Sequence, residues 1–439
     1  MKLTVFVQDR PVATLASTDG FEHVVSYHPD VPPEDFISLL MPVRTKSYDW
    51  PDLHPFFRMN LPEGFLLSIL QEQLGPHVGA SPLSLLRVVG RNVIGRVKVA
   101  SEGADPTSPP VAFELADILK GDNSEEAFVE LVRRFAVSGV SGVVPKFLAP
   151  DALAAYRKGT LPTDRYIIKG STSRLPGVAL NEHLCMEVAR RAGIETAGTQ
   201  VSEDGQALVV SRFDYVGNSA ERLGMEDLCS LLGLRPEQKY EPTWEQVVNR
   251  IKQLVPPEGQ QTALERVADL VLLTYALRNA DCHTKNVALL YSGSQDVRLA
   301  PVYDMLTITV YDDYSRNPPG LAINGRKTWT PGTSLELFLT TRCNLKLARV
   351  QQRIEALCEA MVEVAPRVAQ ASRDYPAFKD IGPRMLHAWN DGMNSLRLRR
   401  TWSLPNLAAC IEAEGFAGIA KPKSPPKEKL GRSQLLAPR

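Results

Sequence analysis

Apolar and other side chains alternate at the start of the chain, as they do in half-buried strands. Leu3, Val5 and Val7 share one face of the first run, a turn follows, and the apolar run 12–15 returns, so the pattern predicts a β-hairpin. Residues 1–105 are therefore predicted to form a small β-rich subdomain. Other elements expected within it are a strand over 24–27, helical turns between 55 and 75, a helix over 83–89 and a strand over 93–99 interrupted by Gly95.

Apolar residues change to helical spacing in the second half of the chain. The helices expected there cover 226–232, 244–254, 262–277, 334–339, 345–364, 365–371 and 381–398. Between the two halves, apolar strands over 166–169 and 207–210 flank a helix that begins near Leu180 and ends at Gly193. The pattern indicates an α/β (α+β) protein in which a β-rich part precedes a helical lobe.

Composition narrows the class of protein. A chain of 439 residues with 44% hydrophobic and 23% charged residues is typical of a folded, multi-lobed soluble protein. The formal net charge is zero, so bulk electrostatics does not favour nucleic-acid binding. Six scattered cysteines without CxxC spacing indicate reduced thiols and a cytoplasmic location. No apolar run approaches the length of a membrane span, and none resembles a signal peptide.

A dense polar stretch, 279–286, lies between an apolar helix and an apolar hairpin that leads to Asp304. Asp281 and Asn286 within it are five residues apart. In a kinase catalytic loop, an Asp accepts the hydrogen bond of the attacking hydroxyl, and an Asn five residues later binds a metal ion. An Asp beyond a hairpin then binds the metals that bridge the phosphates. Lys285 is expected to neutralise the transferring phosphoryl group. The same spacing also arises where an Asp caps a helix and an Asn forms a turn.

A glycine-rich segment, 138–146, has the sequence SGVSGVVPK. Glycines let backbone N–H groups approach phosphate oxygens, and a lysine adds positive charge, so Ser141, Gly142 and Lys146 are candidate phosphate ligands. The segment is not a Walker loop, and an ordinary turn has the same composition.

A lysine, a glutamate and a connector have the order found in the nucleotide-binding lobe of kinases. Lys169 ends an apolar strand, as the phosphate-binding lysine of kinases does, although an exposed edge lysine would look the same. Glu182 begins the next helix, where it is expected to face that lysine. Arg212, Phe213 and Asp214 follow a second apolar strand, at the position of an adenine-binding hinge.

Taken together, these segments resemble the HipA family of bacterial toxin kinases, from the first strand to about residue 400. NADCHTKN resembles its catalytic loop, APVYD its metal-binding aspartate segment and YIIK its ATP-lysine strand. LNEHLCMEVARRAGI is similar to its regulatory helix, and VVSRFDY to its hinge. EDLCSLLGLRPEQKYE is similar to the helix and loop that follow, and LLRVVGRNVIGRVKVA to the end of its N-terminal subdomain. Several motifs in the family's order are more specific than any one of them.

The resemblance implies a two-lobed fold related to protein and phosphoinositide kinases, with ATP and Mg²⁺ as cofactors. It implies that Asp281, Lys285 and Asn286 are catalytic and that Asn286 and Asp304 hold the metal. The residues then expected to contact ATP are Ser141, Gly142, Lys146, Lys169, Glu182, Arg212, Phe213, Asp214 and His283. The expected parts are an N-terminal subdomain over 1–105, an ATP-binding part over 111–215, a helical kinase lobe over 216–420 and a basic, proline-rich, disordered tail over 421–439.

The resemblance also implies partners. They are a HipB-type helix-turn-helix antitoxin, operator DNA contacted through the antitoxin complex, and an aminoacyl-tRNA synthetase phosphorylated on Ser or Thr. Family members often carry an autophosphorylated serine in the glycine-rich loop, where this chain has Gly139, so Ser141 or Ser138 is the expected acceptor. Val144 also departs from the family's usual glutamine, and Cys282 from its usual glycine.

Two alternatives stay open. A small-molecule kinase on the same fold would keep identical catalytic residues. An inactive, antitoxin-binding co-repressor would have no reason to keep Lys169, Asp281, Asn286 and Asp304 together.

Overall fold

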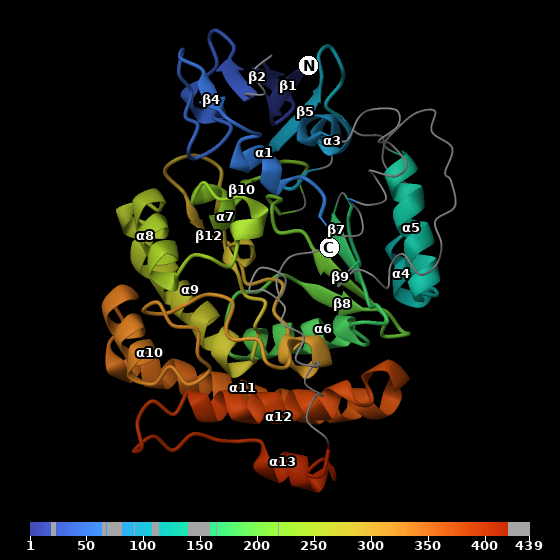
Figure 1. Ribbon diagram of the computed structural model, residues 1–439, viewed down its shortest axis with the longest axis vertical. Helices are drawn as coiled ribbons and strands as arrows, with labels where there is room; N and C mark the ends of the chain where they lie inside the picture. The colour runs from blue at the N-terminus through green and yellow to red at the C-terminus, as the bar shows by residue number, and fades with distance from the viewer. Residues whose placement is uncertain are drawn as a thin grey trace, which may run out of the picture.

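The computed structural model describes residues 1–18, 23–63, 67, 81–91, 93–107, 114–138, 159–163, 165–217 and 219–419. Figure 1 shows a small β-rich unit, drawn in blue, at one end of a larger part in which helices predominate. The predicted fold class, an α/β (α+β) protein with a β-rich N-terminal subdomain and a helical C-terminal lobe, is confirmed.

The N-terminal unit is a five-stranded antiparallel sheet with the strand order β4-β3-β2-β1-β5. Leu3, Val5 and Val7 lie in its buried core, as their alternation predicted. The expected strand over 93–99 begins only at Val97, because Gly95 has a φ of +92° that leaves the extended conformation. The elements are β1 (Lys2–Val7), β2 (Arg10–Ser17), β3 (His23–Tyr27), β4 (Tyr48–Trp50), β5 (Val97–Ser101), α1 (Pro55–Met59) and α3 (Pro82–Val89).

A second antiparallel sheet has the order β6-β7-β9-β8. Its strand β7 pairs on both sides, which places Lys169 in the middle of the sheet, opposite Leu208 of β9. Helix α6 packs on this sheet through Leu184, Cys185 and Val188, which are completely or almost completely buried. The elements are α4 (Leu115–Lys120), α5 (Glu125–Ser138), β6 (Gly159–Pro162), β7 (Tyr166–Gly170), α6 (Val178–Arg191), β8 (Thr199–Val201) and β9 (Ala207–Ser211).

The helical part follows. The last turns of helix α9 in this part are buried on all sides. The position of the polar stretch that follows Leu277 is therefore fixed by the packing of α9. The helices are α7 (Leu228–Leu231), α8 (Trp244–Leu254), α9 (Pro257–Ala276), α10 (Thr333–Leu337), α11 (Leu347–Asp374), α12 (Ile381–Ser395) and α13 (Ala408–Ala413).

The helix expected over 226–232 is partly wrong. Residues 224–227 form β10 (Gly224–Asp227), which pairs with β11 (Ala288–Tyr291), and β11 in turn pairs with β12 (Arg298–Leu299). The helix begins only at Leu228, with Asp227 as its N-cap. Strand pairing satisfies the backbone of this buried segment, and it therefore overrides the local helical spacing.

The two helices expected over 345–364 and 365–371 form one helix, α11, that continues through Pro366. A proline in a helix removes one backbone donor and favours a break. The buried stripe nevertheless continues past it, from Met361 and Val364 to Val368, against α6 and α12. Packing of this stripe offsets the lost hydrogen bond.

Candidate active site

The central cluster joins three segments that are distant in sequence. The Nζ of Lys169, on β7, lies 2.5 Å from Oε1 of Glu182 on α6 and 2.7 Å from Oδ1 of Asp304. Glu182 is buried, whereas Lys169 and Asp304 keep 13% and 21% of their side chains exposed. The structure thus brings the predicted lysine, its predicted glutamate and the distal aspartate together in one partly open place.

Asp304 also meets the catalytic loop. The Nδ2 of Asn286 donates a hydrogen bond to Oδ2 of Asp304 at 2.7 Å, and Oδ1 of Asn286 accepts one from the backbone N–H of His283. Asp304 has a φ of +55°, in the left-handed region that non-glycine residues rarely adopt. Such backbone conformations are costly and cluster at functional sites, where the surrounding structure enforces them.

Asp281 lies just beyond the end of α9. Its backbone N–H donates to the side-chain oxygen of Asn279 at 3.0 Å, which orients the loop, and its Oδ1 accepts a hydrogen bond from the hydroxyl of Tyr240. Sequence reasoning did not single out Tyr240. It lies within the RPEQKYE segment that resembles the family, but 41 residues separate it from Asp281.

His283 is buried in the same loop. Burial is the main reason why its pKa is lowered to about 3, and Lys239 lowers it further. The imidazole is therefore neutral at physiological pH, and it packs edge-to-face on Tyr240 with ring centroids 4.9 Å apart. Its predicted contact with ATP stays a prediction, made by a neutral ring and not by a cation.

Lys285 points to a partner that the sequence did not indicate. Its ammonium group forms an ion pair with Glu63 of the N-terminal part, and burial, which would lower the pKa of Lys285, is outweighed by Glu63 and Asp227. No local pattern marks Glu63, because the two residues are 222 positions apart. Lys285 is thus held by protein carboxylates in this structure.

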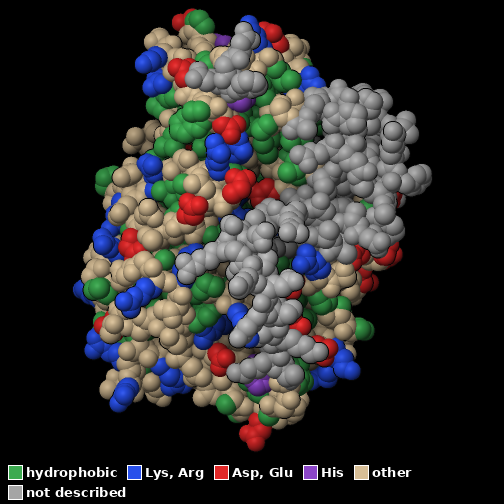
Figure 2. Space-filling model, viewed as in Figure 1, with side chains coloured by type: hydrophobic (Ala, Val, Ile, Leu, Met, Phe, Trp, Pro, Cys, Tyr) green, Lys and Arg blue, Asp and Glu red, His purple; other side chains and the backbone are tan. Residues whose placement is uncertain are grey.

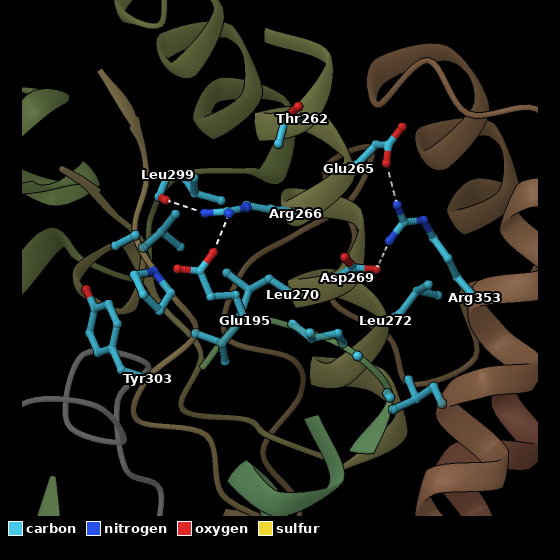
Figure 3. Close-up of a pocket in the computed structure, with 18 of the residues that line it drawn as sticks. Glu195, Thr262, Glu265, Arg266, Asp269, Leu270, Leu272, Leu299, Tyr303 and Arg353 are labelled. Carbon is cyan, nitrogen blue, oxygen red and sulfur yellow. Dashed lines mark hydrogen bonds and ion pairs between the residues drawn. The ribbon is translucent and has the colours of Figure 1, made fainter. Parts of the chain in front are cut away.

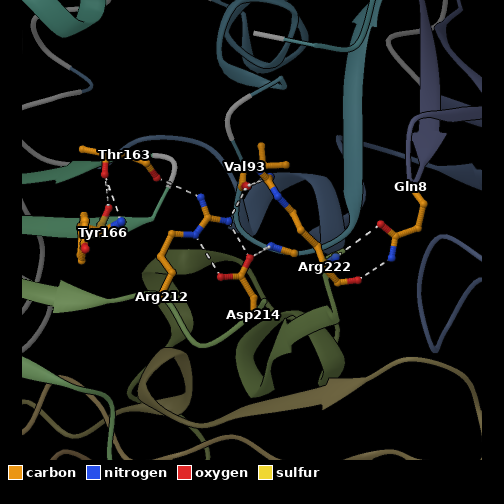
Figure 4. Close-up of polar contacts among 8 residues, drawn as sticks. Gln8, Val93, Thr163, Tyr166, Arg212, Asp214 and Arg222 are labelled. Carbon is orange, nitrogen blue, oxygen red and sulfur yellow. Dashed lines mark hydrogen bonds and ion pairs between the residues drawn. The ribbon is translucent and has the colours of Figure 1, made fainter. Parts of the chain in front are cut away.

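The side chains of the predicted hinge reach the N-terminal unit. Arg212 and Asp214, each 1% exposed, form a two-point ion pair at 3.0 and 2.6 Å, and the guanidinium also donates to backbone oxygens of Val93 and Thr163 (Figure 4). The backbone N–H of Gly95 donates to Asp214. These side chains thus connect the segment after β9 to the N-terminal unit by hydrogen bonds. The prediction that backbone groups of this connector, which includes Phe213, bind adenine stays a prediction.

Most of the glycine-rich loop lies outside the described residues. Ser138 is the last residue of α5, while Ser141, Gly142 and Lys146 lie outside the described residues. Their predicted phosphate contacts, and autophosphorylation at Ser141 or Ser138, stay predictions.

The side chains of the cluster fit a magnesium-bound nucleotide. Mg²⁺ in kinases takes one or two protein carboxylates and completes its shell with phosphate and water. Within the described ranges, no three or more His, Cys, Asp or Glu residues form a closed metal cage. The adjacent oxygen-bearing side chains of Asp304 and Asn286, with the cation of Lys169 beside them, suit that kind of shared coordination.

A separate cavity of about 510 Å³ lies between α9, α11 and the turn after α6 (Figure 3). Its wall carries Arg266, paired with Glu195, and Arg353, 2.5 Å from Asp269. Of the predicted site residues that the structure describes, Asn286 alone lines it. The cavity therefore meets the predicted nucleotide site at Asn286 and otherwise has a lining of its own. In the same described part of the chain, no helix is long and apolar enough to cross a membrane.

Comparisons with known proteins agree with this arrangement. The family profile described as the HipA-like C-terminal domain matches residues 138–368, and the profile of the HipA N-terminal domain matches residues 3–100.

Relatives by sequence are named as kinases. The protein named "Putative kinase Y4mE" of Sinorhizobium fredii is 26% identical over 364 residues, which are 77% of this chain and 84% of the relative. "Putative kinase Y4dM" of the same species is 28% identical over 282 residues, 58% of this chain and 63% of that one.

A solved structure shares the fold. The HipA of Shewanella oneidensis MR-1, found in a complex with HipB and operator DNA, superposes with a TM-score of 0.60 at 18% identity. The match covers 90% of this chain and 96% of that one. The two proteins therefore share their fold over nearly the whole length of both chains.

Proposed function

The chain belongs to the HipA family, and on this premise we propose that it is an ATP-dependent serine/threonine protein kinase, the toxin of a HipA/HipB-type pair. The observation that carries the proposal is the cluster in which Lys169 meets Glu182 and Asp304 while Asn286 meets Asp304. The loop between α9 and β11 holds Asp281 as well as Asn286. This is the constellation that phosphoryl transfer requires.

Each residue has one task in this proposal. Lys169 binds phosphate oxygens of ATP, and Asp304 with Asn286 would hold Mg²⁺, which neutralises phosphate charge when bound. Asp281 accepts the hydrogen bond of the incoming hydroxyl and positions it for attack. Tyr240 keeps one carboxylate oxygen of Asp281 occupied, which fixes the orientation of the other.

The proposed partners rest on the family and on the likeness to a HipA found with HipB and operator DNA. They are a helix-turn-helix antitoxin, operator DNA contacted through the antitoxin complex, and an aminoacyl-tRNA synthetase whose phosphorylation stops translation in the cytoplasm. Expression without the antitoxin is then expected to arrest growth.

The test is radiolabelled ATP added to whole-cell lysate, with wild type, Asp281→Ala and Asp313→Ala compared. Asp313 is an exposed aspartate paired with Arg174 and serves as the matched control. We expect a labelled protein band with wild type and the control, and none with Asp281→Ala. Label that appears only in small molecules would favour the small-molecule kinase, and equal labelling by Asp281→Ala would overturn the assignment.

The same incubation tests self-modification in the glycine-rich loop. A phosphoserine carries about −1.5 to −2 charge, so a phosphate there would repel those of ATP and switch the enzyme off. Intact mass should show one added phosphate, absent from Ser141→Ala and from Asp281→Ala. Loss of the added mass in Ser138→Ala instead would move the acceptor to that residue.

A further inference from the structure

One carboxylate of the N-terminal subdomain reaches the predicted catalytic loop. Glu63, four residues after the end of α1, forms an ion pair with Lys285 and lies 3.6 Å from Nζ of Lys239. Figure 2 shows acidic and basic side chains close together on the face below the N-terminal unit. The docking of this subdomain alone brings Glu63 to the loop, because the chain places them more than 200 residues apart.

The two lysines at this contact stabilise the negative charge of Glu63. Burial by itself would raise the pKa of Glu63, yet Lys285 and Lys239 lower it to about 2. Lys239 and Lys285 keep 19% and 16% of their side chains exposed, and Glu63 keeps 42%, so the contact is partly removed from water on the side of the two lysines. An ion pair that is partly removed from water is screened less than one on an open surface.

Lys285 lies in the same loop as Asp281, and Lys239 lies in a segment that contacts this loop. The carbonyl oxygen of Lys239 accepts hydrogen bonds from the backbone N–H and the hydroxyl of Thr284, at 3.2 and 3.0 Å. The next residue, Tyr240, donates its hydroxyl to Asp281. Glu63 therefore ties together the loop itself, through Lys285, and the segment that braces the loop, through Lys239.

We propose that Glu63 is a positioning residue for phosphoryl transfer. By holding Lys239 and Lys285, it keeps Tyr240 and the loop in register, so that Asp281 is aimed at the acceptor hydroxyl. The N-terminal subdomain thereby takes part in the reaction without touching the nucleotide. This inference rests on the proposed kinase function, and it makes Lys285 a link between subdomains and not the group that neutralises the phosphoryl.

The first variant is Glu63→Gln, which keeps the shape of the side chain and removes its charge. We expect kcat to fall about tenfold, since a small misplacement of a catalytic group is costly, while KM for ATP changes less than twofold. The matched control is Asp9→Asn, which removes the half-exposed carboxylate of the Asp9–Lys98 pair at the turn between β1 and β2 and should leave both constants unchanged. Glu63→Asp, which keeps the charge, should lose less than Glu63→Gln.

A double-mutant cycle separates positioning from general damage. If Glu63 acts through its lysines, Glu63→Gln should cause no further loss of kcat in a Lys239→Met/Lys285→Met background. A full additional loss in that background would overturn the proposal, as would an unchanged or increased kcat in Glu63→Gln. An inactive wild type would instead overturn the kinase function itself, so the two failures are distinguishable in one assay.

Discussion

Two charged clusters of this molecule contrast in how far their side chains are exposed to solvent. At the subdomain junction, Arg212 and Asp214 are each 1% exposed, and Asp214 accepts hydrogen bonds from Arg212 and from the backbone of Gly95. In the cluster around Lys169, the lysine and Asp304 are 13% and 21% exposed, and Asp304 has a left-handed backbone.

The difference indicates that the Arg212–Asp214 pair has a structural role, whereas the cluster around Lys169 is suited to bind a ligand. A closed, fully bonded ion pair fixes two segments relative to one another, and breaking it leaves a charge buried without compensation. A partly open cluster can exchange a protein contact for a ligand contact, and its strained aspartate is the mark of a functional position. Lys169 and Glu182 of one cluster and Arg212 and Asp214 of the other are all predicted from the sequence to contact ATP, yet their surroundings differ.

The largest expected effect is on catalysis at Asp304. Asp304→Asn keeps the size of the side chain and tolerates the left-handed backbone, but removes the charge beside Lys169. We expect kcat to fall at least about 100-fold, since lost electrostatic stabilisation of transferring phosphate costs on the order of a few kcal/mol. The free energy of unfolding in urea should stay near that of wild type. Activity within tenfold of wild type would exclude Asp304 from the site.

The next effect is on stability at Asp214. Asp214→Ala removes the carboxylate that pairs with the buried guanidinium of Arg212, so we expect a loss of about 3–5 kcal/mol in the free energy of unfolding. Removal of both charges in Arg212→Met/Asp214→Leu should cost less than Asp214→Ala alone. Unchanged stability together with weakened ATP binding in calorimetry would show that the side chain serves the nucleotide and not the junction.

The smaller of the two effects on stability is a pH dependence at Glu226, another buried carboxylate at the junction. Burial raises its pKa to about 7, despite hydrogen bonds from Ser38, Leu39 and Tyr291. Because the folded state holds this proton more tightly than the unfolded state, stability from this group is complete below about pH 4.5 and is lost as pH rises through 7. The loss is on the order of 3 kcal/mol.

Urea unfolding between pH 5 and 8 measures this contribution. Glu226→Gln does not titrate, so its stability should fall less with rising pH than that of wild type, whatever its absolute value. Parallel pH profiles for the two proteins would mean that Glu226 is ionised in the folded protein, held by its three donors.

Features that depend on neighbouring positions along the chain could be predicted from the residue pattern alone. The alternation of Leu3, Val5 and Val7 was enough to predict the first hairpin, because period-two burial is a local property of a strand. Asp281 and Asn286 were singled out for the same reason, since their spacing lies within one loop. The order of these segments along the chain then indicated the family that the profile matches show.

The distant residues that meet this loop are brought there by the packing of the whole chain. Glu63 and Tyr240 contact it from 222 and 41 residues away, and no spacing rule reaches across such separations. The strand at Glu226 was missed because pairing with β11 outweighed a helical pattern. Arg212 and Asp214 are likewise buried as an ion pair because the N-terminal part packs against them. The burial of a charged residue depends on elements far along the chain, and local spacing does not reveal it.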